Sequence, residues 1–381
     1  MERDLFSQEH DEYRAVLRDF LAKEVEPHMA AWEQAGIVPR DLYRQLGELG
    51  TMGIQFPEEF GGAGETTFLY NVVLAEELSR LSVHFGGIGL HLDIVVPYFL
   101  DLANDEQRQR WFPGLATGDL VSCIGMTEPG TGSDLAGIST TAVRDGDHYV
   151  VNGSKTFITG GVNAELAVVV VRTGRADDRR GGLSLLVVED GTPGYDHSHK
   201  LDKLGMRATD TAELFFDSVR VPVANLLGEE GKGFDYLTRN LPQERLSIGV
   251  GAISACEAAL ERTIAYVQER SAFGKTIATF QNTKFELADM AADIEAGRAM
   301  VDRAILALDK GRLSVADAAK VKLFTTDLQG EVMDRCLQLF GGYGFMREYP
   351  IAQMYADSRV SRIYGGTNEI MKVIVAQSLG L

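Results

Sequence analysis

Apolar residues recur at helical spacing along the first third of the chain. In the segment 11–25 the apolar positions follow steps of three and four, and the same pattern returns over 67–81. A stretch rich in Gly and Pro, PEEFGGAG (57–64), separates the two segments as a loop. The pattern predicts that residues 1–118 form an N-terminal α-helical domain.

The periodicity changes near residue 120, where short β-prone runs replace the helical pattern. An Asp-Gly pair at 145–146 and an Asn-Gly pair at 152–153 flank the segment 148–151, which predicts consecutive hairpins. Further β-rich runs cover 168–171, 183–188 and 213–221. We therefore expect a compact β domain, a barrel or sandwich, over residues 119–225.

The helical period returns after residue 231 and continues towards the end of the chain. Apolar stripes run over 246–267 and 287–308, and a third helix is expected from the cap residue Ser314 to the Gly pair at 341–342. Long amphipathic helices joined by short loops form antiparallel bundles, so residues 226–381 are predicted to be a helical bundle domain. The order helical, β, helical makes the expected fold class α+β.

Two charged residues interrupt the apolar stripes of this bundle. Glu257 occupies a position of the first stripe and Arg298 a position of the second. Their charges are opposite, and antiparallel packing can bring them to the same level. One interpretation is a buried ion pair between the two helices; the other is that both side chains point to solvent.

The composition narrows the classes of partner. The 381 residues include 55 acidic and 37 basic ones, a formal charge of -18, so neither nucleic acid nor an anionic membrane is an expected partner. No segment reaches about 18 continuous apolar residues, and the opening MERDLFSQEHDEY resembles neither a signal nor a transit peptide. Three widely spaced cysteines fit a reducing compartment and give no metal or disulfide pattern. We expect a cytoplasmic protein without membrane insertion and without a metal site.

Three glycine-rich segments are candidates for ligand binding, and each has a plainer alternative. IGMTEPGTGSD (124–134) can cradle an anion or a heterocycle with backbone N–H groups and hydroxyls, or it can be a solvent loop. LFGGYGF (339–345) follows a helix, so it is either a helix stop or a cofactor contact. IYGGTNEIM (363–371) can direct a helix N-terminus at a ligand oxygen, or it can simply cap that helix.

Glu244 is the candidate acid or base. It lies in NLPQERL, within the first turn expected for the helix over 246–267, and Pro242 stands near the start of that helix. A carboxylate in a first turn ordinarily complements the helix dipole, and this interpretation competes with a catalytic one. The sequence contains no GxSxG or HExxH motif and no His pair at metal-ligand spacing, so hydrolase and metalloenzyme classes have no support.

Taken together, the motifs resemble those of the acyl-CoA dehydrogenases over essentially the whole chain. GMTEPGTGSDLAG (125–137) is similar to one signature of that family, and QLFGGYGFMREYPIAQMYADSR (338–359) is similar to the other. Between them, ERSAFGKTIATFQ (269–281) resembles the family's segment that reaches the cofactor of a neighbouring subunit. Three such motifs in this order are far more specific than any one of them.

The resemblance implies that FAD lies between the middle β domain and a C-terminal four-helix bundle, and that a neighbouring subunit of a homotetramer completes each site. The residues implied to hold FAD within one chain are Ile124, Met126, Thr127, Gly132, Ser133, Phe157, Ile158, Thr159, Thr367, Asn368 and Glu369. The residues implied to reach the neighbour's FAD are Arg270, Phe273, Gln281, Gln338, Leu339, Phe340, Gly341 and Gly342.

A departure from the commonest family pattern indicates the catalytic base. Most members carry the base glutamate where this chain has Gly365, whereas the long-chain and isovaleryl-CoA types place it at the start of the long bundle helix. LPQERL with GGTNEIM is most similar to the long-chain type, which makes Glu244 the implied base and leaves the backbone N–H of Gly365 as a donor to the thioester oxygen. The residues implied to contact acyl-CoA are Ser133, Pro242, Gln243, Glu244, Arg245, Gly365 and Gly366.

The implied reaction is the α,β-dehydrogenation of an acyl-CoA thioester to the trans-2-enoyl-CoA, as in fatty acid β-oxidation. Glu244 would take the α proton, the β hydrogen would leave as hydride to flavin, and an electron-transfer flavoprotein would accept the electrons. The segment 85–100 is expected to line the acyl pocket. Two other interpretations stay open: an acyl-CoA oxidase or flavin monooxygenase on the same scaffold, and a non-catalytic subunit of a hetero-oligomer. The retention of Glu244 and of the TEPGTGSD and TNE motifs argues against a non-catalytic subunit.

Overall fold

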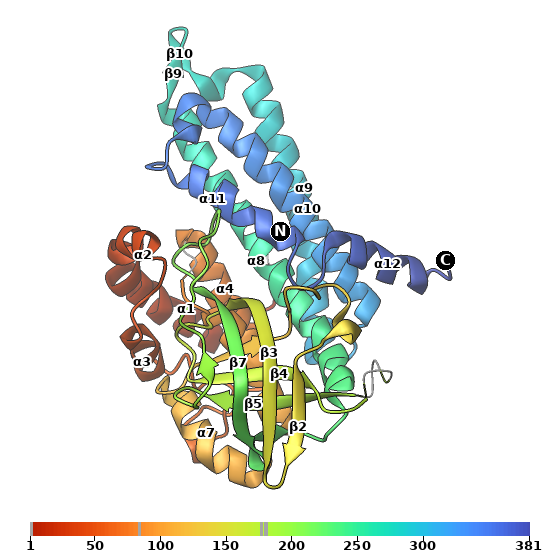
Figure 1. Cartoon of the computed structure of the whole chain (residues 1–381). Helices are drawn as coiled ribbons and strands as arrows, with labels where there is room; N and C mark the ends of the chain where they lie inside the picture. The colour runs from red at the N-terminus through yellow and green to blue at the C-terminus, as the bar shows by residue number, and fades with distance from the viewer. Residues whose placement is uncertain (1–2, 83–84, 176–177, 179–181) are drawn as a thin grey trace.

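The chain runs from helices through a β-sheet to long helices, which confirms the predicted fold class (Figure 1). The computed structural model describes residues 3–82, 85–175, 178 and 182–381. Three long helices project from the body of the molecule, while the N-terminal helices and the sheet form the lower part in the same view.

The N-terminal part is a set of helices around one apolar core. Its elements are α1 (Gln8–Phe20), η1 (Leu21–Val25), η2 (Glu26–His28), α2 (Met29–Ala35), α3 (Asp41–Glu48), η3 (Glu58–Phe60), α4 (Leu69–Leu81), α5 (Ile88–Leu90), η4 (His91–Val95), α6 (Val96–Leu102) and α7 (Asp105–Thr117). The two segments with clear helical periodicity became α1 with η1, and α4. Both η1 and η4 are π-helical turns, which carry one residue more than an α-helical turn. Large buried side chains such as Trp111 and Tyr98 fill the core.

The middle part is one mixed sheet of eight strands. The strands are β1 (Ser122–Gly125), β2 (Thr141–Asp145), β3 (His148–Thr159), β4 (Leu166–Arg172), β5 (Leu183–Glu189), β6 (Tyr195–Asp196), β7 (Thr211–Pro222) and β8 (Leu226–Leu227). Short helices η5 (Leu135–Gly137) and η6 (Val223–Asn225) lie in its connections. The order is β6-β7-β3-β2-β4-β5-β8, and β1 pairs in parallel with β4. Strands β4 and β5 are almost wholly buried, which explains their continuous apolar sequence.

Only one of the two predicted hairpin turns is a turn. Gly146, with φ of 62°, joins β2 to β3 as expected. The pair at 152–153 instead lies inside β3, where the register with β7 shifts and Gly153 has φ of 144°. The second hairpin is therefore wrong, because pairing with the long strand β7 turns a local turn signal into a β-bulge.

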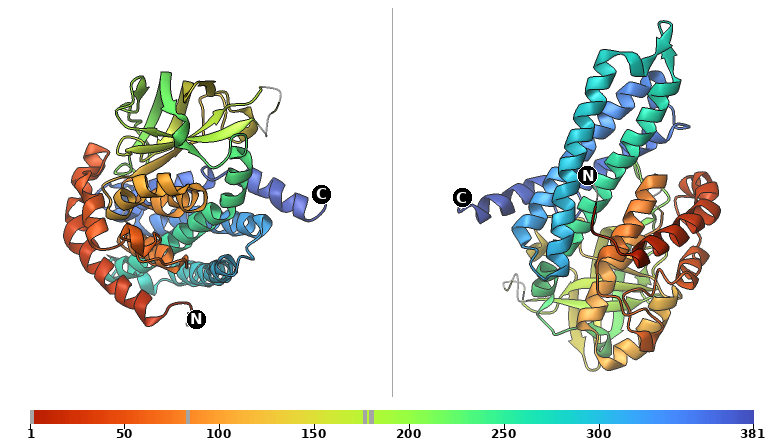
Figure 2. Two further views of the ribbon diagram at one scale, coloured as in Figure 1. Left: turned by 90° about the horizontal axis from the view of Figure 1, so that it is seen from below. Right: turned by 180° about the vertical axis from the view of Figure 1, so that it is seen from behind.

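The C-terminal part contains the long helices α8 (Gly233–Glu269), α9 (Gln281–Asp309) and α10 (Val315–Phe340), which lie side by side (Figure 2). A hairpin of β9 (Ser271–Ala272) and β10 (Lys275–Thr276), followed by η7 (Ile277–Thr279), joins α8 to α9. The chain ends with η8 (Gly341–Phe345), α11 (Pro350–Ser358), η9 (Arg359–Arg362) and α12 (Asn368–Ser378). Ser314 caps α10 as predicted, since its side chain accepts a hydrogen bond from Asp317 N at 3.0 Å.

The long helix α8 begins earlier than the sequence suggests. It starts at Gly233, so Glu244 lies eleven positions inside the helix and Pro242 is an interior residue. The expected start near residue 244 is wrong because residues 233–241 are also helical and pack their apolar side chains; Leu237 is only 1% exposed. That packing tolerates a proline that would otherwise end the helix.

Within the described ranges, no helix combines the length and the apolar character needed to cross a membrane. The three cysteines, Cys123, Cys256 and Cys336, are all buried and free.

Candidate active site

Glu244 lies in the interior, where α8 passes α6. The residue is 4% exposed, and the hydroxyl of Tyr98 on α6 donates a hydrogen bond to its Oε1 at 3.0 Å. Burial raises the pKa of Glu244 to about 7, against the opposing effects of the Tyr98 hydrogen bond and the Arg245 charge. The helix-dipole interpretation fails, because that effect is confined to about the first turn of a helix. A buried carboxylate with a pKa near neutrality is suited to accept a proton.

The turn at Gly365 faces the same part of α8. Gly365 and Gly366 have φ of 64° and 92°, in the left-handed region that favours glycine. A Cβ built on Gly365 would collide with Cδ1 of Ile248, one helical turn beyond Glu244. Arg245 Nε also lies 3.4 Å from the Gly365 carbonyl oxygen, at the long limit of a hydrogen bond. The structure thus brings together the predicted residues 244, 245, 365 and 366.

Lys322 on α10 holds this turn from the other side. The side chain is fully buried, and Nζ donates to the Gly366 carbonyl at 2.9 Å and to Asn368 Oδ1 at 2.7 Å. Burial and the nearby Arg245 charge lower the pKa of Lys322 to about 8. Since a charged group is buried only at a considerable free-energy cost, its bonds to the turn mark it as a structural support of the site.

The predicted cofactor residues after the turn are largely engaged within the chain. Asn368 Nδ2 donates to Thr326 Oγ1 at 3.0 Å and to Asp327 Oδ1 at 2.9 Å. The Thr367 side chain caps α12, and Glu369 is exposed in the first turn of that helix. These side chains fix the turn, and their contact with a cofactor stays a prediction.

The two predicted cofactor segments of the sheet lie side by side. Thr156 N donates to the Thr127 carbonyl at 3.0 Å, which joins the loop after β1 to the end of β3. The register of β3 with β7 shifts between residues 155 and 158, and this bulge gives Phe157 a φ of 60° and leaves it 69% exposed. Bulges commonly re-aim a side chain beside an active site.

A buried ion pair fixes the loop after β1. Lys155 Nζ donates to Glu128 Oε1 at 2.9 Å and to the Met126 carbonyl at 3.2 Å. Glu128 also accepts hydrogen bonds from Ser139 and Thr140 in the connection that leads to β2. Burial alone would raise the pKa of Glu128, but Lys155 and these hydrogen bonds lower it to about 2. The loop is thereby held in one conformation.

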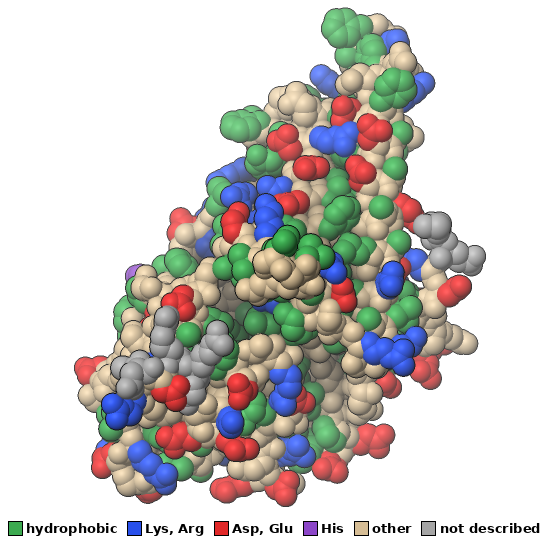
Figure 3. Space-filling model, turned by 90° about the vertical axis from the view of Figure 1, so that its right-hand side faces the viewer, with side chains coloured by type: hydrophobic (Ala, Val, Ile, Leu, Met, Phe, Trp, Pro, Cys, Tyr) green, Lys and Arg blue, Asp and Glu red, His purple; other side chains and the backbone are tan. Residues whose placement is uncertain are grey.

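This part of the chain fits a flat heterocycle that carries polar edges and phosphates. A Cβ built on Gly130 or on Gly132 would meet nothing within 4 Å, so the glycine loop faces open space. Thr127 and Ser133 place hydroxyls in the glycine loop, and Thr159 places one two residues after the exposed Phe157. Backbone N–H groups of a glycine loop suit anions. Figure 3 shows the surface hollowed where the projecting bundle meets the rest of the molecule.

The remaining predicted cofactor residues form a second group at the far end of the bundle. A groove of about 460 Å³ is lined by Tyr266, Arg270, Ile277, Gln338, Leu339, Phe340, Gly341, Gly342, Tyr343 and Met346. Phe273, in the hairpin beyond the groove, is 95% exposed, and Gln281 is exposed at the start of α9. The structure therefore brings Arg270 and residues 338–342 together in one groove, while their contact with a cofactor stays a prediction.

One chain does not bring the two groups to a single cofactor. Glu244 and Tyr266 are 22 positions apart on the same helix, which is about 33 Å at about 1.5 Å per residue. This length far exceeds a flavin ring, so the second group could not contact a flavin ring placed beside Glu244 of its own chain. The separation is the arrangement expected if the second group serves a neighbouring copy.

Sequence reasoning missed Tyr98 and Lys322. A signal existed for each: Tyr98 is a phenol in the apolar segment proposed for the acyl pocket, and buried tyrosines usually find a hydrogen-bond partner. Lys322 stands four positions after the buried Ala318 and three before the buried Thr325 on one face of α10. A charged residue on a buried helical face needs partners, but its partners lie in a distant turn.

The sequence matches three family models in chain order. They describe the acyl-CoA dehydrogenase N-terminal domain at residues 7–119, the middle domain at 123–219 and the C-terminal domain at 231–380. The chain belongs to the acyl-CoA dehydrogenase family, whose members are FAD flavoproteins that oxidise acyl-CoA. The resemblance inferred from the motifs is confirmed.

Individual members of this family match nearly the whole chain in sequence and in structure. The mitochondrial long-chain specific acyl-CoA dehydrogenase of Rattus norvegicus is 46% identical over 378 residues, which cover 99% of this chain and 88% of the relative. The crystal structure of an acyl-CoA dehydrogenase from Geobacillus kaustophilus is 48% identical, with a TM-score of 0.97 and 100% of both chains covered. A glutaryl-CoA dehydrogenase from Mycobacterium smegmatis in complex with FADH2 is 28% identical, with a TM-score of 0.89, and the match covers 98% of this chain and 95% of that one.

Proposed function

We propose that this enzyme converts an acyl-CoA thioester to the trans-2-enoyl-CoA, with Glu244 as the base that removes the α proton. The observation that carries the proposal is the buried Glu244 carboxylate, whose pKa is raised to about 7 and whose helix packs against the Gly365 turn. A glutamate of ordinary pKa, about 4.3, is a weak base for a carbon acid. Burial strengthens it, and an acyl chain that excludes water strengthens it further.

The Gly365 turn is proposed to stabilise the charge that develops on the thioester oxygen. The Gly365 N–H donates no hydrogen bond to the described residues, so it is free to point at a ligand. Preorganised donors of this kind lower the free energy of an enolate-like transition state. Lys322 and Arg245 contact the carbonyl side of the same turn and hold the N–H in place. FAD, when bound, supplies the acceptor for the hydride that leaves the β carbon.

The glycine loop at 124–133 and the bulge at 157–159 are proposed to hold FAD within the chain. The Glu128–Lys155 pair presets the loop, and the bulge exposes Phe157 beside it. Ser133, Pro242, Gln243, Arg245 and Gly366 are proposed to contact acyl-CoA. The segment 85–100 is proposed as the acyl pocket wall, because Tyr98 from this segment contacts Glu244.

The second group, at Arg270 and residues 338–342, is proposed to complete the FAD site of a neighbouring copy in a homotetramer. Its distance from Glu244 and the 95% exposure of Phe273 support this assignment. Light scattering of the FAD-loaded enzyme tests it, and a fully active monomer would contradict it. An electron-transfer flavoprotein is proposed as the electron acceptor. The rat relative is mitochondrial, so the cytoplasmic location expected for this chain stays a prediction.

The proposed base is tested by anaerobic stopped-flow reduction of the bound flavin. A panel from butyryl-CoA to palmitoyl-CoA identifies the preferred chain length, and Glu244→Gln is then compared with wild type on that substrate. Flavin reduction should fall by orders of magnitude while FAD and substrate still bind. Glu261→Gln is the matched control, an exposed glutamate on the same helix, and should reduce normally. Near-normal reduction in Glu244→Gln would refute the proposal.

A further inference from the structure

A single hydrogen bond links the proposed base to the N-terminal helices. The hydroxyl of Tyr98 donates to Glu244 Oε1 at 3.0 Å, although the two residues lie 146 positions apart. Tyr98 is 0% exposed and Glu244 4% exposed, so water does not compete for this bond. Among the described residues, the only hydrogen bond to the Glu244 carboxylate is this one to Oε1, and none reaches the other oxygen.

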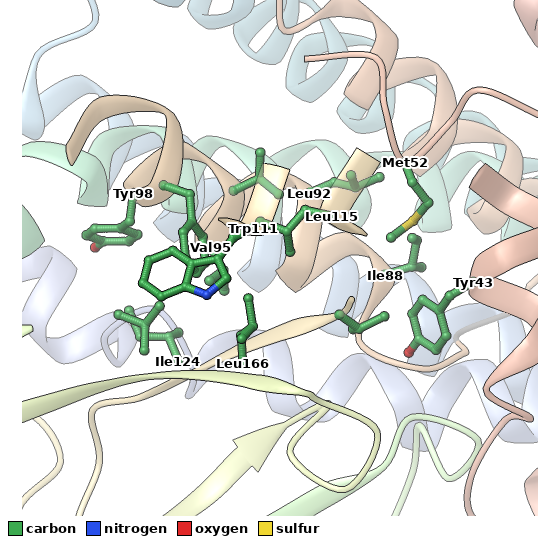
Figure 4. Packing of buried hydrophobic residues seen from close by; sticks show 14 of the residues in the cluster. Tyr43, Met52, Ile88, Leu92, Val95, Tyr98, Trp111, Leu115, Ile124 and Leu166 are labelled. Carbon is green, nitrogen blue, oxygen red and sulfur yellow. The ribbon is translucent and has the colours of Figure 1, made fainter. Parts of the chain in front are cut away.

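The Tyr98 ring is held rigidly. Figure 4 shows it at one end of the buried cluster that includes Val95, Trp111 and Ile124, with its hydroxyl directed away from Trp111. The π-helical turn η4 directly precedes α6, and its extra residue rotates the following side chains by about 100° relative to an uninterrupted α-helix. This local irregularity sets which face of α6 meets α8.

We propose that Tyr98 is the positioning residue of the base: it holds the Glu244 carboxylate in its ionised form and leaves the second oxygen free for the α proton. The proposal rests on the proposed function, in which Glu244 is the base. The neutral Tyr98 hydroxyl stabilises the Glu244 anion through one hydrogen bond, without the long-range field of a cation. Because this bond holds Oε1 towards α6, the other carboxylate oxygen faces away from that helix.

In the part of the chain that the structure describes, no charged side chain near Glu244 donates a hydrogen bond to its carboxylate, so the positioning role falls to Tyr98. From α8, Arg245 adjoins the carboxylate, and Arg239 lies near Tyr98 but pairs with Asp101 at 3.2 Å. From η4, Asp93 is buried and takes its own hydrogen bonds from Asn71 and Ser247. From α10, Lys322 is directed to the Gly366 turn. The Tyr98 hydrogen bond is the larger of the two influences that oppose burial, so its removal raises the pKa of Glu244 above about 7.

The test is the pH dependence of kcat/KM for Tyr98→Phe, measured on the FAD-loaded enzyme with palmitoyl-CoA and ferricenium ion as electron acceptor. The acid limb of kcat/KM reports the base in the free enzyme. Loss of one hydrogen bond to a charged group should move the midpoint of this limb upward by about one pH unit or more. The rate should therefore fall about tenfold near pH 6 and recover towards wild type near pH 9.

Tyr149→Phe is the matched control. Tyr149 is also buried, at 1% exposure, and donates to a carboxylate, Glu230 Oε2, at 2.8 Å in the sheet region. Its removal should leave the acid limb unchanged. A second variant places 3-fluorotyrosine at position 98, which keeps the shape and makes the hydroxyl a stronger donor. That variant should move the acid limb to lower pH.

An unchanged acid limb in both position-98 variants, or a rate lowered equally at every pH, would overturn the positioning role. The Glu244→Gln result separates this failure from failure of the proposed function. If Glu244→Gln still reduces flavin, the assignment of the base is wrong. If Glu244→Gln is inactive and the position-98 variants keep the wild-type profile, only the role of Tyr98 is wrong.

Discussion

Arg298 on α9 donates hydrogen bonds to both carboxylate oxygens of Glu257 on α8, with Nε 2.8 Å from Oε1. Of the two interpretations of the interrupted stripes, the structure shows the ion pair, but the pair is buried on one side only. Arg298 is 3% exposed, whereas the Glu257 side chain is 43% exposed. Arg298 also contacts Ser254 at 2.9 Å and Glu76 at 3.3 Å, so its charge is shared among three partners.

This asymmetry predicts unequal effects on stability. Arg298→Met leaves Ser254 and the part-buried Glu76 with fewer donors, and the free energy of unfolding should fall by about 2–4 kcal/mol. Glu257→Gln removes an exposed partner while Arg298 keeps the others, so the loss should stay below about 1 kcal/mol. Urea unfolding of the FAD-loaded enzyme measures both values. Equal losses in the two variants would contradict the one-sided burial.

Glu244 should make the protein less stable as the pH rises. Its pKa is about 7 in the folded chain against 4.5 ordinarily, so between these values the folded state binds more protons than the unfolded state. The free energy of unfolding therefore falls as pH rises through this range. Glu244→Gln removes this pH-dependent decrease in the free energy of unfolding. The variant should be more stable than wild type by up to about 3 kcal/mol at pH 8 and equally stable near pH 4.5.

Urea unfolding at a series of pH values measures that difference. Three other buried carboxyls with a raised pKa, Asp93, Asp210 and Asp357, act equally in both proteins and cancel in the comparison. Glu261→Gln should show no pH-dependent difference from wild type. A wild-type protein as stable as Glu244→Gln at pH 8 would show that Glu244 is not buried as an anion.

A glutamate at position 365 should restore only part of the flavin reduction that is lost in Glu244→Gln. In Glu244→Gln with Gly365→Glu, the new Cβ collides with Ile248 and requires a positive φ, both of which misplace the carboxylate. Adding Ile248→Ala opens the space, and flavin reduction should rise above that of the double variant while staying below wild type. Stopped-flow bleaching ranks the variants. A triple variant no faster than the double one would show that the collision is not what limits recovery.

Lys322 should be needed for turnover, although it lies on α10 behind the turn. Lys322→Met leaves the Gly366 carbonyl and Asn368 Oδ1 without their buried donor, which loosens the turn that carries the Gly365 N–H. The rate of flavin reduction should fall at least about tenfold with a smaller change in KM. Lys320→Met is the matched control, because Lys320 pairs with Asp317 on the exposed face. Equal rates in the two variants would remove Lys322 from the site.

The order of helices and strands could be predicted from the sequence alone, because hydrophobic periodicity is a local property of the chain. The spacing over 11–25, 67–81 and 287–308, and the Ser314 cap, needed only neighbours within a few turns, and these elements formed as predicted. The motifs likewise identified the family and its cofactor, because the loop that follows β1 and the turn at 365–366 keep their chemistry in short contiguous segments.

Features that depend on partners far along the chain could be seen only in the folded structure. Asn152-Gly153 reads locally as a turn, but pairing with β7 makes it a bulge. Glu244 reads as a first-turn acid, but packing of the preceding residues extends α8 back to Gly233 and leaves the carboxylate in the interior. The environment of Glu244 was likewise out of reach of local patterns, because Tyr98 meets it only when two regions 146 residues apart are packed together. Burial and hydrogen bonding set a pKa, and both are properties of the folded chain rather than of a segment.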